Sequence, residues 1–421
     1  MASSNPKTVL VVGGGTFGTS TAYHLSLKPQ TYSHITVLDR FPVPSKEAAG
    51  NDINKVIRND YADPLYARLT TEAMALWADP QGLYKGLYHR SGWLLGAAES
   101  SKEFVDQSAV TARKLGLVVA EPVTADEIHK RWPVFTGEMD GWSTVWNPSA
   151  GWANARGALT QLALAAQRSG VQYIDGPQGH VVQLLYNESG RCVGAKAADG
   201  SAYFADIVVL AAGAAAAALL DFKGQLVAKG HTVGHMHCSP AELEKYGNMP
   251  IIAHLEGGLL FPPQEDGILK FGAMAFVTNF EGKDLSLPRY RSDNKEDGVP
   301  KPIETQMRNW LRECMPELAD RDWFETRLCW DADTPDLHFL IDKHPSYPGL
   351  HLAVGGSAHG FKMMPVIGKY VVDSLEDVLE AEAKDKWRWR PGAKLQHANP
   401  HPSPLLELSE IPGFQRSSRK L

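Results

Sequence analysis

The chain has 421 residues, of which 43 % are hydrophobic, and a formal net charge of −6. This length predicts two or three domains around a large buried core. The acidic balance argues against nucleic-acid binding and against docking on acidic membranes, and no apolar run reaches the ~18 residues that span a membrane.

The cysteines and the two ends of the chain indicate in which cellular compartment we expect the protein. The four cysteines have no C-x-x-C spacing, which indicates neither a disulfide framework nor a zinc site, so we expect no metal and a reducing environment. The short polar stretch before the first predicted strand leaves no room for a signal peptide. Residues 419–421, Arg-Lys-Leu, approximate a peroxisomal address. We expect an intracellular monomer, in the cytoplasm or the peroxisome.

The stretch TVLVVGGGTFG, residues 8–18, predicts a dinucleotide-binding unit. A short apolar strand ends in a G-x-G-x-x-G turn, a helical pattern follows, and a second apolar strand, 35–38, ends at Asp39. The motif glycines are Gly13, Gly15 and Gly18. The first permits a tight turn, the second lets a pyrophosphate approach, and the third lets the helix pack closely. Asp39 can accept ribose hydroxyls. FAD and NAD both fit this stretch.

The rest of the chain alternates predicted helices and strands. Helices are expected over 65–77, 101–115, 124–132, 151–170, 303–315 and 363–378. Strands are expected over 88–96, 171–174, 181–186, 192–197, 203–204, 327–330, 339–341 and 350–354. Residues 231–280 alternate in the manner of an antiparallel sheet, and residues after 386 are expected to be irregular. The polar loop 41–64 is long enough to indicate a functional role.

Two later glycine turns are candidate cofactor contacts. The segment ADIVVLAAGA, 205–214, predicts a second backbone contact with the same dinucleotide; an ordinary strand-end turn is the alternative. The segment GGSAHGFK, 355–362, leads from a strand into a helix whose N-terminus suits a group that becomes anionic, such as a reduced flavin. Lys362 would add a fixed cation for a carboxylate or the flavin edge, or is a solvated lysine.

The chain resembles the sarcosine-oxidase-like flavoproteins, and within them the fungal amadoriases, which are fructosyl amino acid or fructosyl peptide oxidases. The matching segments are VVGGGTFGTSTAYHL, VLDRFPVPS, AGNDINKVI, GWANARGAL, VVLAAGA, CWDADTPDLHFLID, GGSAHGFKMMPVIGKYVVD and KWRWRPG. The resemblance implies an α/β fold, α+β overall, with a Rossmann-type FAD-binding domain and a discontinuous antiparallel-sheet substrate domain. The implied ranges are 1–90, 150–230 and 325–385 for the first domain, 91–149 and 231–324 for the second, and 386–421 for a C-terminal tail.

The resemblance also implies roles for single residues. Cys329 matches the cysteine that bonds to the flavin 8α-carbon; a buried free thiol is the alternative. Lys270 matches the lysine over the flavin that promotes reaction with oxygen, unless it is an outward strand lysine. Asn54 and Lys55 match a polar pair that relays protons beside it. The implied FAD contacts are Gly13, Gly15, Thr16, Phe17, Gly18, Asp39, Arg40, Ser45, Cys329, Gly356, Gly360, Phe361 and Lys362.

The implied substrate contacts are Arg58, Met274, Ser357 and Lys362, with Lys362 on the substrate carboxylate. Met274 departs from the family, because amadoriases carry a glutamate there that grips the sugar and sarcosine oxidases carry a histidine. Methionine binds a hydroxyl poorly and makes an apolar wall. Arg58 resembles the carboxylate-binding arginine of sarcosine oxidases. For the sugar-side arginine of amadoriases, Arg390 and Arg416 are candidates.

The resemblance therefore implies an FAD-dependent oxidase of N-substituted amino acids. The amine would bind neutral, hydride transfer would give an imine that water hydrolyses, and oxygen would take the electrons as hydrogen peroxide. Fructosyl amino acids are the leading substrates; saccharopine, pipecolate and N-methyl amino acids are the alternatives. A flavin-binding protein without oxidase turnover, or a nicotinamide dehydrogenase, are the rival functions.

Overall fold

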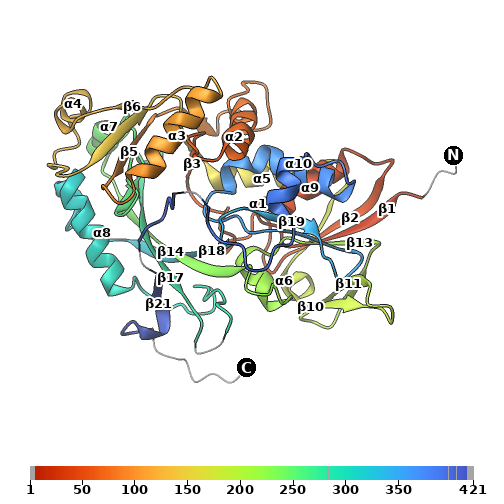
Figure 1. Cartoon of the computed structure of the whole chain (residues 1–421). Coiled ribbons are helices and arrows are strands. Elements are labelled where there is room, and N and C mark those ends of the chain that lie inside the picture. Colours follow the sequence, from red (N-terminus) through yellow and green to blue (C-terminus); the bar gives the residue numbers. More distant parts are fainter. Residues whose placement is uncertain (1–4, 282–283, 397, 404, 415–421) are drawn as a thin grey trace.

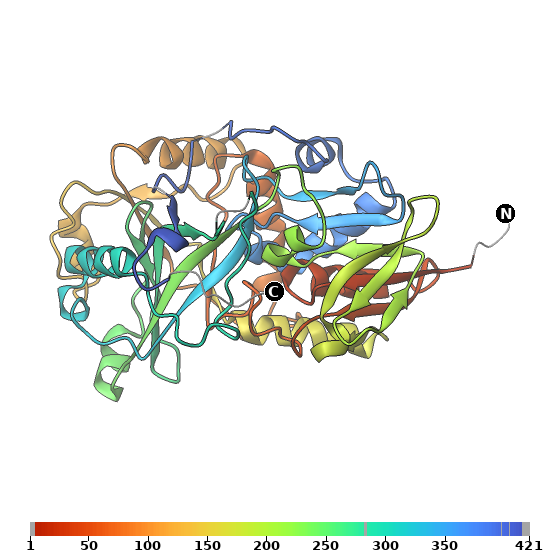
Figure 2. The same cartoon turned by 90° about the horizontal axis from the view of Figure 1, so that it is seen from below.

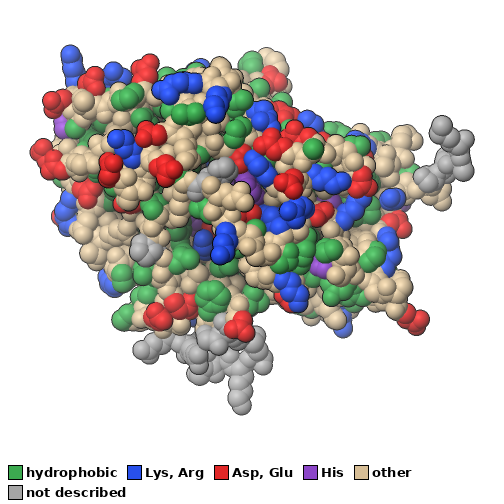
Figure 3. Space-filling view, in the orientation of Figure 1, with side chains coloured by type: hydrophobic (Ala, Val, Ile, Leu, Met, Phe, Trp, Pro, Cys, Tyr) green, Lys and Arg blue, Asp and Glu red, His purple; other side chains and the backbone are tan. Residues whose placement is uncertain are grey.

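The structure is a computed structural model that describes residues 5–281, 284–396, 398–403 and 405–414. Figure 1 shows two lobes side by side, one built on the N-terminal strands and one on a larger sheet. Within the described ranges, no helix is both long and apolar enough to cross a membrane. On the face drawn in Figure 3, Lys and Arg side chains are interspersed with Asp and Glu.

The first lobe is organised around a six-stranded sheet. Its strands in spatial order are β19 (Leu340–Lys343), β20 (Leu350–Val354), β13 (Ile207–Leu210), β1 (Lys7–Val12), β2 (Tyr32–Leu38) and β9 (Gln172–Ile174). All neighbours pair in parallel except β19 with β20. Because both faces are covered, the strands are apolar throughout, as the sequence predicts for β1.

Helices cover one face of this sheet and a small sheet covers the other. On the helical face α1 (Thr16–Ser26) packs between α5 (Ala155–Arg168) and α9 (Met364–Leu375). The opposite face packs against an antiparallel sheet. Its strands are β10 (Val181–Tyr186), β11 (Cys192–Ala197) and β12 (Ala202–Phe204).

The second lobe contains a nine-stranded sheet. Its strands are β18 (Glu325–Asp333), β14 (Val227–His237), β17 (Ile268–Thr278), β16 (Gly258–Leu260), β15 (Ile251–His254), β5 (Trp93–Ala97), β7 (Ser143–Asn147) and β6 (Glu121–Pro122), with β21 (Leu405–Glu407) added to β17. The sheet is mostly antiparallel, but β15–β5 and β17–β21 are parallel. The helix α8 (Lys301–Cys314) buries its apolar side against it.

The paired strands β14 and β18 run side by side toward the first lobe, as Figure 2 shows. β18 belongs to the larger sheet, whereas the predicted FAD-binding domain includes residues from 325 onward. The domain ranges remain predictions. A further small sheet joins β3 (Lys55–Ile57), β8 (Gly151–Ala153) and β4 (Tyr88–His89).

The remaining described elements are helices and 3₁₀ turns. The helices are α2 (Pro64–Trp77), α3 (Lys102–Lys114), α4 (Ala125–Arg131), α6 (Gly176–Gly179), α7 (Pro240–Tyr246) and α10 (Ala381–Trp387). The 3₁₀ turns are η1 (Gly213–Ala218), η2 (Pro316–Leu318), η3 (Phe361–Met363) and η4 (Leu408–Glu410).

The structure confirms most predicted elements and corrects four. The helix predicted over 151–170 is a strand and then a helix, because Asn154 caps α5 by accepting a hydrogen bond from Gly157. The strand predicted over 88–96 is divided at Gly92, which has a positive φ. Within 231–280 the sequence reading missed α7, although Ser239 opens it with a capping box. The tail contributes β21 to the sheet and is therefore not wholly irregular.

Candidate active site

The glycine turn after β1 forms a close backbone cradle. Gly13 has a φ of +106°, and a Cβ there would lie 2.5 Å from the carbonyl oxygen of Ala211. A Cβ on Gly18 would lie 1.8 Å from the carbonyl oxygen of Gly13. Only glycine therefore fits either position. These contacts explain the predicted tight turn and close helix packing.

The acid at the end of β2 lies beside this turn. Asp39 accepts hydrogen bonds of 2.8 Å from the backbone N–H of Gly14 and from that of Phe41. Burial raises its pKa, and these two hydrogen bonds oppose the shift. Its neighbour Arg40 forms an ion pair with Asp293, which holds the loop after β17 against this turn. Asp39 is thus fixed in place and still lines the cavity described next.

An extended cavity runs from the glycine turn to the edge of the larger sheet. It is lined by Gly13, Gly15, Thr16, Phe17, Asp39, Arg40, Ser45, Gly356, Gly360 and Phe361, all of which the sequence assigned to a cofactor. Residues 211–214, the end of the second predicted backbone contact (205–214), line it too, as do Lys55 and Asp331. A long cavity with a nucleotide cradle at one end and charged groups at the other fits FAD.

Cys329 lies on β18, one residue from the cavity-lining Trp330. Its Sγ is 3.9 Å from Lys55 Nζ and 3.9 Å from the carbonyl oxygen of Ala49. The thiol is therefore buried at the end of the cavity that carries the charged groups.

Lys270 is buried in a cluster that the sequence located only in part. Its Nζ lies 2.6 Å from Asp52 Oδ2 and donates to the backbone carbonyl of Asn54 at 2.8 Å. Asp52 also lies 3.4 Å from Lys55 Nζ and 3.4 Å from an Arg327 nitrogen. One carboxylate thus faces three cations. The sequence reading missed Asp52 and Arg327, although Asp52 stands inside the motif AGNDINK.

The charges in this cluster shift the pKa of both partners. Burial alone would raise the pKa of Asp52, but Lys270, Arg327 and Lys55 hold it well below its usual range. Burial lowers the pKa of Lys270 to about 8, against the opposing charge of Asp52. The Asn54 side chain, which the resemblance placed beside Lys270, is buried and has no hydrogen-bond partner among the described residues.

A second pair of cations meets at an aromatic ring. The Lys362 ammonium and the Arg58 guanidinium lie 5.6 and 5.0 Å from the centre of the Tyr61 ring. Lys362 donates to the carbonyl of His359, and Arg58 to that of Asp60. Burial, followed by the charges of Arg58 and Lys55, lowers the pKa of Lys362 well below its usual range. The two cations can bind a carboxylate together.

The other two predicted substrate residues, Met274 and Ser357, lie in different parts of the fold. Met274 is buried on β17, where the pairing with β14 jumps from Val233–Gly272 to His231–Phe276, so residues 273–275 form a bulge. The Ser357 hydroxyl is buried between the carbonyl of Gly355 and the amide of Thr334. Both hydrogen bonds hold the Ser357 hydroxyl to backbone groups of the protein, so the proposed substrate site does not include Ser357.

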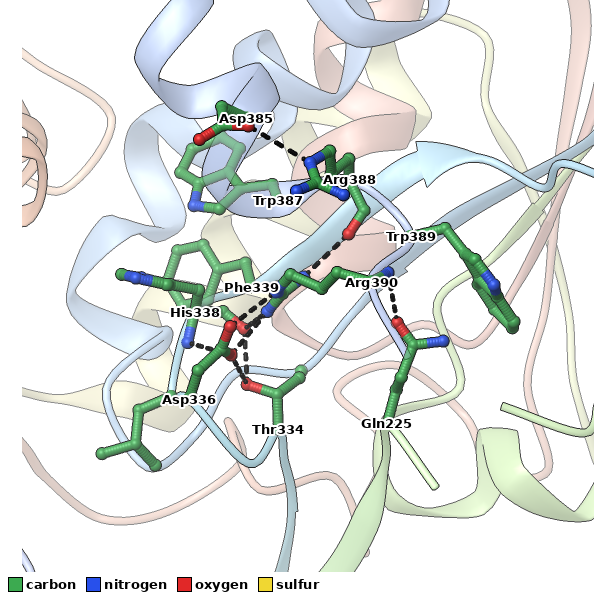
Figure 4. Close-up of polar contacts among 12 residues, drawn as sticks. Gln225, Thr334, Asp336, His338, Phe339, Asp385, Trp387, Arg388, Trp389 and Arg390 are labelled. Atoms are coloured by element: carbon green, nitrogen blue, oxygen red, sulfur yellow. Dashed lines mark hydrogen bonds and ion pairs between the residues drawn. The ribbon is translucent and has the colours of Figure 1, made fainter. Parts of the chain in front are cut away.

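Arg390, one candidate for the sugar-side arginine, is engaged in an ion pair within the protein. Figure 4 shows its guanidinium turned to the Asp336 carboxylate, with which it makes hydrogen bonds of 2.6 and 2.7 Å, while its backbone N–H donates to Gln225. The pair is buried and holds the tail against the first lobe. The other candidate, Arg416, lies outside the described residues.

Comparisons with known proteins match this architecture. A family model described as FAD dependent oxidoreductase matches residues 8–374. L-saccharopine oxidase of Schizosaccharomyces pombe is 34 % identical over 411 residues, covering 92 % of this chain and 94 % of that protein. The crystal structure of fructosamine oxidase (Amadoriase II) from Aspergillus fumigatus in complex with FSA has 35 % identity, a TM-score of 0.87 and 97 % coverage of both chains. A thermally stable mutant of fructosyl peptide oxidase has 33 % identity, a TM-score of 0.89 and coverage of 98 % and 99 %.

Proposed function

The chain belongs to the family of FAD-dependent oxidoreductases, and from this premise we propose that it is an oxidase of N-substituted amino acids that releases hydrogen peroxide. Membership in this family, with its structural neighbours, confirms the resemblance, the α/β fold class and FAD as the cofactor. When bound, FAD takes two electrons from a substrate and passes them to an acceptor, for which we propose oxygen. The chain's own residues supply binding, orientation and charge.

The observation that carries the proposal is the pair of cations at Tyr61. Lys362 and Arg58 form no ion pair with any carboxylate in the part of the chain that the structure describes, so both are available to a substrate carboxylate. Their charges also disfavour an ammonium group beside them. The substrate amine is thereby held as the neutral base, the form that can be oxidised to an imine.

Lys270 is proposed to serve the reaction with oxygen. Its ammonium lies in a buried, low-dielectric position where a fixed cation strongly stabilises developing negative charge. Asp52 and the Asn54 carbonyl fix its position. Lys55 touches both Asp52 and the Cys329 thiol, and so links this cluster to the cavity.

Two substrate classes are supported by different observations. Fructosyl amino acids are supported by the architecture shared with fructosamine oxidase and fructosyl peptide oxidase. A secondary amine without a sugar, such as saccharopine, pipecolate or an N-methyl amino acid, is supported by the relative named L-saccharopine oxidase. Met274 also favours this second class, because its thioether offers a sugar hydroxyl no strong hydrogen bond.

A peroxide-release screen tests the proposal. The holoenzyme is supplied with fructosyl-lysine, L-saccharopine, L-pipecolate and sarcosine in air. We expect peroxide from at least one, and expect Lys362→Met to raise KM for that substrate at least tenfold through loss of a charge-assisted hydrogen bond. Lys369→Met is the matched control, since Lys369 is a surface lysine paired with Glu72. If the protein is yellow but releases no peroxide from any of these substrates, the rival function, a flavin-binding protein without oxidase turnover, is favoured instead.

Three further features are part of the proposal. Cys329 forms a covalent bond to the flavin, supported by its burial at the charged end of the cavity. The enzyme acts as a monomer on small molecules. It works in the cytoplasm or the peroxisome, and the C-terminal tripeptide on which the second address depends lies outside the described residues.

A further inference from the structure

Two histidines from distant parts of the chain meet at one phenylalanine. His231 on β14 is paired with Phe276 of β17 on one side and with Cys329 of β18 on the other. Its ring centre lies 4.1 Å from that of Phe276. His401, which precedes β21, has its ring centre 5.2 Å from the same phenylalanine. Directly paired residues point to the same face of a sheet, so His231 shares the face of Cys329.

Each imidazole has a ring nitrogen without a partner. His231 Nε2 and His401 Nδ1 are shielded from solvent and form no hydrogen bond with the described residues. A buried polar atom left in this way costs free energy unless a ligand or an ordered water satisfies it. Neither histidine is used by the chemistry proposed above.

The surroundings of both rings are positively charged. Burial, then the charges of Lys229, Arg58 and Lys362, lowers the pKa of His401 to about 3. Burial, then His401 and the lysines around it, lowers the pKa of His231 well below its usual value. Both imidazoles are therefore neutral and lie near several cations. A neutral imidazole has one N–H, and in the tautomer with the proton on the unpartnered nitrogen each ring offers a free donor.

Two of the acids nearby are engaged with cations, and a third, Asp331, accepts hydrogen bonds from the backbone N–H groups of Ala332 and Ala358. Lys229, two residues before His231 on β14, lies 3.1 Å from Asp333. Asp52 faces Lys270, Lys55 and Arg327. A ligand that enters this region meets cations and two imidazoles that can each donate an N–H, and an anion is the group that such a region stabilises.

We propose that His231 and His401 form a second carboxylate-binding subsite, which selects amino acids whose nitrogen substituent carries a carboxylate of its own. The first carboxylate would lie at Lys362 and Arg58, and the second at the two imidazoles. The substrate class is then an N-(carboxyalkyl) amino acid. This inference rests on the proposed oxidase function and specifies its substrate.

The wild-type holoenzyme tests the subsite with a matched pair of ligands. N-(3-carboxypropyl)glycine and its terminal amide, N-(3-carbamoylpropyl)glycine, have nearly the same size and differ by one charge. We expect the acid to bind at least tenfold more tightly in anaerobic calorimetry, and to have a kcat/KM at least tenfold higher. Equal binding of the two ligands, or binding of neither, overturns the subsite.

The two proposals fail in different ways. Peroxide release from both ligands at equal kcat/KM overturns the subsite and keeps the oxidase. A preference for the acid in calorimetry without peroxide release from any secondary amine overturns the oxidase and keeps the anion subsite.

Variants of the histidines assign the preference to these residues. His231→Leu and His401→Leu should each raise KM for the acid at least tenfold while KM for the amide stays within about twofold. The control is His237→Leu, because His237 lies on the same strand but is exposed and stacked on Phe324. If both variants keep the wild-type preference for the acid, the assignment to these histidines is wrong. If one variant fails to fold, the comparison of the acid and the amide on the wild-type holoenzyme still tests whether the subsite exists.

Discussion

Replacement of Lys270 by methionine separates the reaction with oxygen from the reaction with substrate. At an effective dielectric constant of about 20, a unit charge about 4 Å from developing negative charge contributes ~4 kcal/mol, which is about 10³-fold in rate. Lys270→Met removes that charge, and Asp52 keeps two cations at 3.4 Å, Lys55 and Arg327, so the cluster is not left with an unpaired carboxylate. We expect the rate of reaction with oxygen to fall by about 10³ and the rate of reaction with substrate to fall far less.

Stopped-flow absorbance measures the two rates separately. Anaerobic mixing with substrate bleaches the flavin band, and a second mixing with oxygenated buffer restores it. The exposed lysine of the Lys301–Glu304 pair provides the control, Lys301→Met. Lys270→Arg, which keeps the charge, should retain most of the oxygen rate. An equal loss in both half-reactions would refute the assignment of Lys270 to oxygen.

The pKa of Lys270 gives the same prediction a pH dependence. Burial lowers this pKa to about 8, so the ammonium is present at pH 7 and is lost as the pH rises. The rate of reaction with oxygen should therefore fall as the pH passes through about 8 in the wild-type enzyme. In Lys270→Met this step should be absent, and a step that persists would have to come from another group.

Three further predictions follow from single side chains. Cys329→Ser should release its flavin into the supernatant on acid precipitation, whereas the wild-type precipitate stays yellow; equal release would remove the proposed thioether. Met274→Glu should raise kcat/KM for fructosyl-lysine about tenfold by adding a charged acceptor for a hydroxyl, and an unchanged value would mean that residue 274 does not limit sugar binding. Arg390→Met should lower the free energy of unfolding in urea by about 3 kcal/mol, because it leaves Asp336 buried without its partner. KM should stay unchanged, and a large rise in KM would restore Arg390 as a substrate residue.

The sequence predicted best what is encoded locally. The turn from Gly13 to Gly18 and the acid at residue 39 were identified because their spacing along the chain is itself the geometry of the site. The helix predicted over 124–132 was found for the same reason, since Thr124 and Glu127 form a capping box at the start of α4. Short apolar runs were less decisive, since α7 contains few residues and its apolar spacing also fits a strand.

Contacts between residues that are far apart in the sequence could not be predicted from local sequence patterns. Asp52 and Arg327 meet only because β18 pairs with β14 while the loop before β3 folds back onto the same face. His401 reaches Phe276 only because β21 adds to β17. The resemblance to a family supplied the roles of Lys270 and Lys362, but it did not identify Asp52, Arg327, His231 or His401.

The cost of burying Lys362 indicates why the site takes an acid. An ammonium without a carboxylate partner loses its hydration on folding, and its lowered pKa expresses that penalty. Natural selection for stability alone would replace it with an apolar side chain or supply an acid, as Asp52 is supplied to Lys270. A protein that keeps this cation buried without an acidic partner stores free energy that a carboxylate ligand recovers on binding. The ring nitrogens of His231 and His401 likewise lack hydrogen-bond partners among the described residues. A ligand with two carboxylates could bind Lys362 with one and these two imidazoles with the other.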